Sequence, residues 1–243
     1  MAIQVAEAVL AGINGGIDGI GYWTFSDFPD NVEKEYTNKW GAMRWSDDDH
    51  SARDLYYGVA LLTRNLRGPS AVLKSTGSDG LLRITSVRQQ DGALSIAVLN
   101  RRAKAVPVRI GLGTAVERPF RRFHFDPAHP PRHPFADLPP ADGLKPCPAE
   151  GFTDEIPGMS LAVYTTDYED MAPSTPAGVT VAQRDGHRVA SWQAVPDKDL
   201  CYYRVFCGDR QVGSTIATEL VLPADANGPT TVRAVDDSGN VSP

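Results

Sequence analysis

The sequence has no apolar run close to the roughly 18 residues that a membrane-spanning helix needs. Positive charge is also scarce, since 24 Lys and Arg against 30 Asp and Glu leave a formal net charge of −6. This balance argues against a protein that binds nucleic acid or an anionic membrane. The residues after Met1 hold neither a basic segment nor a cleavage site, so we do not expect a secretory signal peptide. A Gly-rich phosphate loop and a Gly-x-Ser-x-Gly nucleophile motif are lacking too.

Cysteine is rare: Cys147, Cys201 and Cys207 are the three in the chain, and their spacing matches no metal-binding motif. Cys201 and Cys207 fall on one expected strand, where six residues separate their Cα atoms by about 20 Å. A disulfide bond needs Cα atoms within about 7 Å of each other. We therefore expect free thiols, and we expect neither a metal ion nor a cofactor to be bound.

What the sequence does have is the composition of a folded, turn-rich protein. Of its 243 residues 42% are hydrophobic, and 22 Gly with 19 Pro exceed the usual share. The length suits one large domain or two to three small ones. We expect a mainly β fold in three domains: a helix–strand–loop–helix segment at 1–67, an antiparallel β-sandwich at 68–172 and a second sandwich at 173–243.

The first of these zones carries the helical periodicity. Apolar residues at helical spacing predict a helix that ends at Asn14-Gly15-Gly16, and residues 17–25 then read as a short buried strand. A polar loop rich in aromatic residues follows. Ser51 to Asp54 resembles a capping box that starts a second helix, which Gly68-Pro69 ends. The loop thus follows the carboxyl end of a strand, where α/β folds place their sites.

From residue 70 the hydrophobic period changes to two, which is typical of strands. We expect strands at 71–74, 81–87, 94–99, 106–110 and 159–165, with a long Pro-rich irregular stretch at 117–150. After the stiff linker Ala172–Pro176, short strands are expected at 179–182, 188–192, 202–207, 211–214, 218–222 and 230–235. Their spacing of about 8–12 residues is that of a sandwich.

The last 70 residues resemble a bacterial fibronectin type III module. The matching features are Pro176 before the first strand, Trp192 on the second, and Val232-Arg-Ala-Val-Asp236 followed by Gly239-Asn-Val-Ser242. The resemblance implies that Trp192 fills the core between two sheets, as a large aromatic side chain does well.

Residues 1–172 resemble the C-terminal part of a clan A glycoside hydrolase, a retaining (β/α)₈ barrel close to the xylosidase and iduronidase family. Gly21-Tyr-Trp-Thr-Phe-Ser-Asp27 is similar to the eighth barrel strand, and the flanking helices are similar to the seventh and eighth helices. The sandwich that follows resembles the accessory domain of such enzymes. The resemblance implies that Trp23 is a platform for the sugar to be cleaved, that the Trp23–Thr24 peptide bond is cis, and that the parent enzyme is secreted or periplasmic.

Retaining hydrolysis needs two carboxylates about 5–5.5 Å apart, one as nucleophile and one as acid/base. The resemblance places them on the fourth and seventh barrel strands, which correspond to no residue of this chain. We therefore expect no catalytic residue here, an inactive chain, and a carbohydrate substrate for the parent alone. Asp27 is a candidate for a hydrogen bond to a sugar hydroxyl. An open barrel segment also favours self-association, because its strand edges need cover.

Other interpretations of particular residues and of the function remain open. Asp47-Asp48-Asp49 is a weak candidate for calcium, and the acidic loop with Asp30, Glu33 and Glu35 is expected to be solvated. Four residues, His124, Asp126, His129 and His133, invite a zinc interpretation, yet their spacing fits no standard zinc motif. The alternative function is a stand-alone carbohydrate- or protein-binding module, or a rigid spacer without a ligand.

Overall fold

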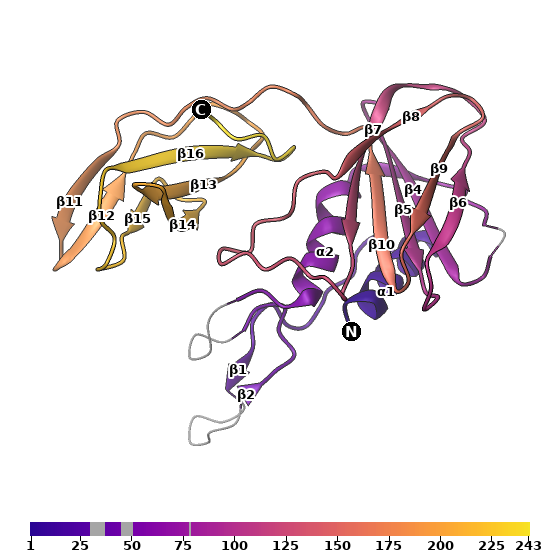
Figure 1. Cartoon of the computed structure of the whole chain (residues 1–243), viewed down its shortest axis with the longest axis horizontal. Helices are drawn as coiled ribbons and strands as arrows, with labels where there is room; N and C mark the ends of the chain where they lie inside the picture. The colour runs from indigo at the N-terminus through magenta and orange to yellow at the C-terminus, as the bar shows by residue number, and fades with distance from the viewer. Residues whose placement is uncertain (30–36, 45–50, 78) are drawn as a thin grey trace. The chain divides into compact units, whose positions relative to one another are not determined.

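The structure is a computed structural model that describes residues 1–29, 37–44, 51–77 and 79–243. It divides into two compact units, Met1–Asp167 and Tyr168–Pro243 (Figure 1). The fold is mainly β, with several antiparallel sheets and two helices among the described residues, as the sequence predicts. No helix within these ranges is long and apolar enough to cross a membrane.

Among its described residues, the first unit holds two helices and ten strands. They are α1 (Ala2–Asn14), β1 (Phe28–Pro29), β2 (Thr37–Asn38), α2 (Asp54–Asn65), β3 (Ser70–Leu73), β4 (Leu82–Gln89), β5 (Leu94–Asn100), β6 (Val106–Ile110), β7 (Val116–Phe125), β8 (Gly143–Cys147), β9 (Phe152–Ile156) and β10 (Ser160–Thr165). Six strands form one antiparallel sheet in the order β3-β4-β5-β10-β7-β8, and β6 pairs with β9 in a separate sheet.

These elements stack in three layers, with the six-stranded sheet in the middle. Side chains of β5 and β10 alternate between two cores: Leu99 and Leu161 join the helices, whereas Val98 and Ala162 join β6 and β9. Figure 1 shows α1 and α2 against one face of this sheet. Because both faces of β5 and β10 are covered, these strands are almost continuously hydrophobic. Residues 1–67 therefore share a core with the sheet that follows them.

The expected buried strand at residues 17–25 is wrong. No strand forms there, and Ile17, Ile20, Trp23 and Phe25 are all exposed. The physical reason is that a hydrophobic run becomes a buried strand only when neighbouring strands pair with it. In the described residues the nearest such pairing is a single parallel bridge between Ser26 and Met43.

Two boundaries also differ from the expectation. Helix α2 begins at Asp54 with Arg53 as its N-cap, and no side-chain hydrogen bond caps it, so Ser51 does not act as a capping box. Residues 117–150 are not irregular throughout, because β8 and all of β7 except Val116 lie within them. Pro119 obscures the strand pattern, and the register with β8 shifts between Val116 and Phe120 at that point.

The second unit is a β-sandwich of two three-stranded sheets. Its strands are β11 (Thr180–Arg184), β12 (His187–Ser191), β13 (Leu200–Cys207), β14 (Arg210–Thr215), β15 (Glu219–Val221) and β16 (Thr230–Asp236). One sheet has the order β11-β12-β15 and the other β14-β13-β16. Trp192 is buried in the core between them, where its ring contacts Tyr203 edge-on at 5.4 Å. All three cysteines of the chain are free thiols.

Candidate functional site

Four exposed aromatic residues come from two segments that hydrogen bonds join, and we call them the aromatic patch: Tyr22, Trp23, Phe25 and Trp40. Trp23 is 77% exposed, Phe25 68% and Trp40 55%, which is unusual for side chains of this size. The peptide bond between Trp23 and Thr24 is cis, so this part of the expectation is confirmed. An aromatic face open to solvent is a surface on which a sugar ring could stack.

Hydrogen bonds join the two segments that carry the aromatic patch. The amide N–H groups of Ala42 and Met43 donate to the carbonyl oxygens of Thr24 (3.2 Å) and Phe25 (2.8 Å). The Tyr22 hydroxyl donates to the Trp40 carbonyl at 2.8 Å. Segments 22–27 and 40–43 are thereby joined, and the exposed rings from both lie on one support.

Asp27 fixes this support to helix α2. Its side chain is 0% exposed, and its two carboxylate oxygens accept hydrogen bonds from Arg53 Nη2 at 2.5 Å and from the Gly41 N–H at 2.8 Å. Arg53 is the N-cap of α2, so one buried carboxylate ties together three segments of the chain. This contact gives Asp27 a positioning role. Its expected hydrogen bond to a sugar hydroxyl stays a prediction.

Gly41 lets the segments approach this closely. A Cβ atom at position 41 would lie 2.2 Å from the Asp27 nitrogen and 2.3 Å from the Ser26 carbonyl carbon, and both of these are backbone atoms that cannot move aside. Neither Gly41 nor Arg53 was singled out by the sequence, because a close backbone approach and an ion pair across 26 residues leave no periodic signal.

Two other candidate regions from the sequence lie outside the described residues: the acidic loop at Asp30, Glu33 and Glu35, and the triplet Asp47–Asp49.

The histidine-rich stretch does not gather its ligand atoms around one point, within the residues described. His129 Nδ1 bonds Asp126 at 2.9 Å, and His133 Nδ1 accepts from the backbone N–H groups of Phe135 and Asp137. Burial, followed by the positive charge of Arg122, lowers the pKa of His124.

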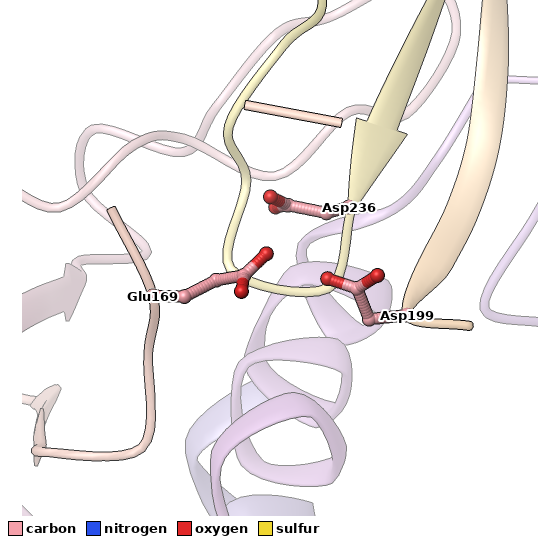
Figure 2. Close-up of side chains that lie close together, drawn as sticks. All are labelled: Glu169, Asp199 and Asp236. Carbon is pink, nitrogen blue, oxygen red and sulfur yellow. The ribbon is translucent and has the colours of Figure 1, made fainter. Parts of the chain in front are cut away.

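A cluster of three carboxyl groups was missed by the sequence analysis. Glu169, Asp199 and Asp236 bring one oxygen each within 4.8 Å of one another (Figure 2). Glu169 precedes the linker, Asp199 precedes β13 and Asp236 ends β16. Because the three residues are far apart in the sequence, no spacing pattern indicates that they meet. Oxygen-only groups of this kind are what hard cations prefer. Within the residues described they are also the set of side chains best placed to hold such an ion.

The cluster is tied into the second unit by hydrogen bonds of Asn240. Its backbone N–H donates to one oxygen of Asp236 at 2.7 Å, and its side-chain amide donates to the other at 2.8 Å and to the Glu169 carbonyl at 3.0 Å. A hydrogen bond with Asp199, then burial and the nearby charges of Asp199 and Asp236, raises the pKa of Glu169 to about 7. Glu169 therefore holds a proton at a higher pH than an isolated carboxyl group does.

A second polar network lies in the first unit and stabilises its layers. Asp154 on β9 accepts from the Tyr164 hydroxyl (2.7 Å) and Arg122 Nε (2.6 Å), and pairs with Lys145 Nζ at 3.1 Å. Burial opposes ionisation of Asp154, but these hydrogen bonds outweigh it and lower its pKa to about 2. Because each polar group has a partner, we assign the network a structural role.

Comparison with known proteins yields a likeness in structure alone. No family model and no curated protein matches the sequence. The chain is similar to the catalytic domain of a GH30 xylanase C from Talaromyces cellulolyticus, with a TM-score of 0.51, 12% identity, and coverage of 68% of this chain and 34% of that one.

A GH30 endoxylanase from Clostridium papyrosolvens C71 gives a TM-score of 0.51, 11% identity, and coverage of 68% and 37%. A glycoside hydrolase family 30 subfamily 8 xylanase from Clostridium acetobutylicum gives a TM-score of 0.51 and 9% identity, with coverage of 68% of this chain and 38% of that one. The match thus spans little more than a third of the length of these xylanases. At this low identity the likeness concerns the fold alone, and about two thirds of the chain is folded like part of these three structures.

Proposed function

We propose that these 243 residues are the C-terminal part of a retaining β-glycoside hydrolase that acts on carbohydrate. The observation that carries the proposal is the exposed aromatic patch around Trp23, held on a rigid support in a chain whose fold is that of part of several xylanases. The narrower resemblance to the xylosidase and iduronidase family belongs to this proposal, as does the fibronectin type III character of residues 173–243.

In this proposal Trp23 is the sugar platform. Its indole is 77% exposed, although a ring of this size gains free energy when it is covered, and a sugar ring offers C–H groups that suit its face. The Asp27 carboxylate is buried and holds together the segments that carry Trp23 and Trp40. We therefore propose Asp27 as a positioning residue for the platform.

The bond-breaking groups lie elsewhere in the proposed enzyme. Retention requires a nucleophile and an acid/base carboxyl about 5–5.5 Å apart on either side of the scissile bond. The family resemblance gives no residue of this chain either role, and Asp27 is engaged with Arg53 and Gly41. On this account residues 1–243 supply part of the binding surface and are inactive without the rest of the barrel.

The test compares variants in a longer polypeptide that carries these residues together with the proposed barrel. Trp23→Ala should lower kcat/KM for nitrophenyl glycosides at least tenfold, and Trp23→Phe should recover much of the loss because an aromatic face remains. The matched control is Ile216→Ala, which removes a side chain that is 83% exposed in the second unit and should leave kcat/KM unchanged. Unchanged kinetics for a folded Trp23→Ala protein would remove the platform role.

The exposed apolar surface also motivates a proposal of self-association. Ile17, Ile20, Trp23 and Phe25 are exposed apolar side chains that lie within nine residues of one another in the sequence. Light scattering on residues 1–243 should report species larger than a monomer as concentration rises. A monomer at all concentrations would contradict this expectation and leave the proposed glycosidase function untouched.

A further inference from the structure

The chain passes from the first unit to the second between two anchored residues. Asp167 belongs to the first unit, where its carboxylate pairs with Arg67 Nη2 at 2.7 Å. Glu169 belongs to the second unit, where its N–H donates to the Ser238 hydroxyl oxygen at 3.0 Å. In the sequence only Tyr168 lies between these two anchors. The connection that both anchors leave between the units is therefore one residue long.

Residues 169–174, which we call the strap, follow this connection and are fastened to the second unit mainly by polar contacts. At the end of the strap the Ser174 N–H donates to Asp197 Oδ2 at 3.2 Å. Pro173 is buried, whereas the Met171 side chain is 74% exposed. A segment that hydrogen bonds hold at the surface opens locally more readily than a strand packed in a core.

Asn240 provides the central fastening of the strap. Its side-chain amide donates to the carbonyl oxygens of Glu169 at 3.0 Å and Met171 at 3.1 Å, and to Asp236 Oδ2 at 2.8 Å. The two hydrogens of one amide thus serve three acceptors. The Asn240 backbone N–H also donates to Asp236 Oδ1 at 2.7 Å, and Asp236 is a buried residue at the end of β16. Asn240 is therefore itself held by the folded sheet of the second unit.

We propose that Asn240 is a latch that sets the length of the flexible connection between the two units. While its amide holds the strap, this connection is Tyr168; when the strap is released, the connection extends from Tyr168 through Ser174. The end-to-end distance of a flexible chain grows with its length, so release lets the units move more freely with respect to each other. The inference goes beyond the proposed function and is independent of it, because no sugar contact enters the argument.

The experiment compares Asn240→Ala with the matched control Asn227→Ala in the whole chain. Asn227 also donates to a backbone carbonyl of the second unit, that of Asp225 at 3.0 Å, but not to the strap. Asn240→Ala should accelerate amide hydrogen exchange at Glu169 and Ser174 at least tenfold, because both N–H groups are donors only while the strap is closed. Cleavage after Glu169 by a Glu-specific protease should rise by a similar factor, because it reports the open population. The control should match the parent.

Nuclear magnetic resonance relaxation tests the consequence for the two units. They should share one rotational correlation time in the parent and show two different values in Asn240→Ala. Ser238→Ala removes the acceptor of the Glu169 N–H and should give a smaller change in the same direction. This second variant keeps the test available if Asn240→Ala does not fold.

Amide exchange on β13 distinguishes release of the strap from unfolding of the second unit. Exchange on β13 should stay at the parent rate in the variant in which the strap opens. Equal acceleration on β13 and on the strap would show that Asn240 supports the whole sandwich, and the latch would then be wrong. Unchanged exchange and cleavage at the strap, or units that already tumble separately in the parent, would also overturn it. None of these results bears on the proposed glycosidase function.

Discussion

The carboxylate of Asp27 accepts a hydrogen bond from Arg53 Nη2 at 2.5 Å, and this pair joins the segment that carries Trp23 to the first turn of α2. Asp27 is fully buried whereas Arg53 is one quarter exposed, so the charge on the carboxylate depends on its partners for compensation. The position of the aromatic patch therefore depends on a residue that the solvent does not reach.

Asp27→Asn should release this connection. The variant leaves Arg53 without its carboxylate, and breaking a buried pair of this kind costs about 3 kcal/mol. Thermal unfolding should begin at a lower temperature, and amide exchange should accelerate in residues 22–29 and 40–44. The exposed Asp18→Asn change serves as the control and should have no effect. Equal stability of both variants would show that the pair contributes little.

Gly41→Ala tests the close approach of the two segments. The added methyl group would lie 2.2 Å from the Asp27 nitrogen, so the backbone must separate and the free energy of unfolding should fall by about 1–3 kcal/mol. Gly21→Ala is the matched control, because its methyl group meets nothing within 4 Å. Denaturant unfolding measures both. A Gly41→Ala protein as stable as the control would refute the packing described at Asp27.

The stability of the first unit should decline in acid because of Asp154. Its pKa is about 2 in the folded chain against an ordinary value of 3.8, so the ionised form is the one that folding favours. The contribution is present above about pH 4 and is lost as the pH falls toward 2. In Asp154→Asn this part of the pH dependence should disappear, and the protein should lose about 1–3 kcal/mol at neutral pH. Unfolding curves between pH 2 and 6 make the comparison.

The second unit should show the opposite trend through Glu169. Its pKa is raised from 4.5 to about 7, so the protonated form is the one that folding favours. Stability from this group is present below about pH 4.5 and is lost as the pH rises through about 7. Glu169→Gln should flatten the profile, whereas the exposed Asp209→Asn should preserve it. A stability that rises between pH 5 and 8 in the parent protein would contradict the carboxyl cluster.

The sequence predicts the secondary structure of this chain well where an element buries one face or where a strand is buried on both faces. The spacing of apolar residues in helix α1 and in strands such as β5 and β10 is visible in the sequence. Trp192 lies in a core as expected. The prediction is wrong at residues 17–25, because the pattern shows that a strand suits the segment but not whether neighbours are there to pair with it. It also misses β7, where Pro119 interrupts the alternation.

The candidate site is less accessible to sequence reasoning than the fold. Trp23 and Asp27 stand out by residue type and by resemblance, and the structure places them on one support. Gly41, Arg53 and the carboxyl cluster with Glu169 come from segments distant in the chain. Side chains that meet through tertiary folding leave no spacing rule in the sequence, so only the structure reveals them.

The most direct measurement of the central claim is hydrolysis of a panel of nitrophenyl glycosides by purified residues 1–243, beside a longer polypeptide that carries these residues together with the proposed barrel. The account predicts no turnover by residues 1–243 above the buffer rate. It also predicts hydrolysis with retained anomeric configuration by the longer polypeptide. Turnover by residues 1–243 alone would contradict it, because the catalytic carboxyls would then have to lie within this chain.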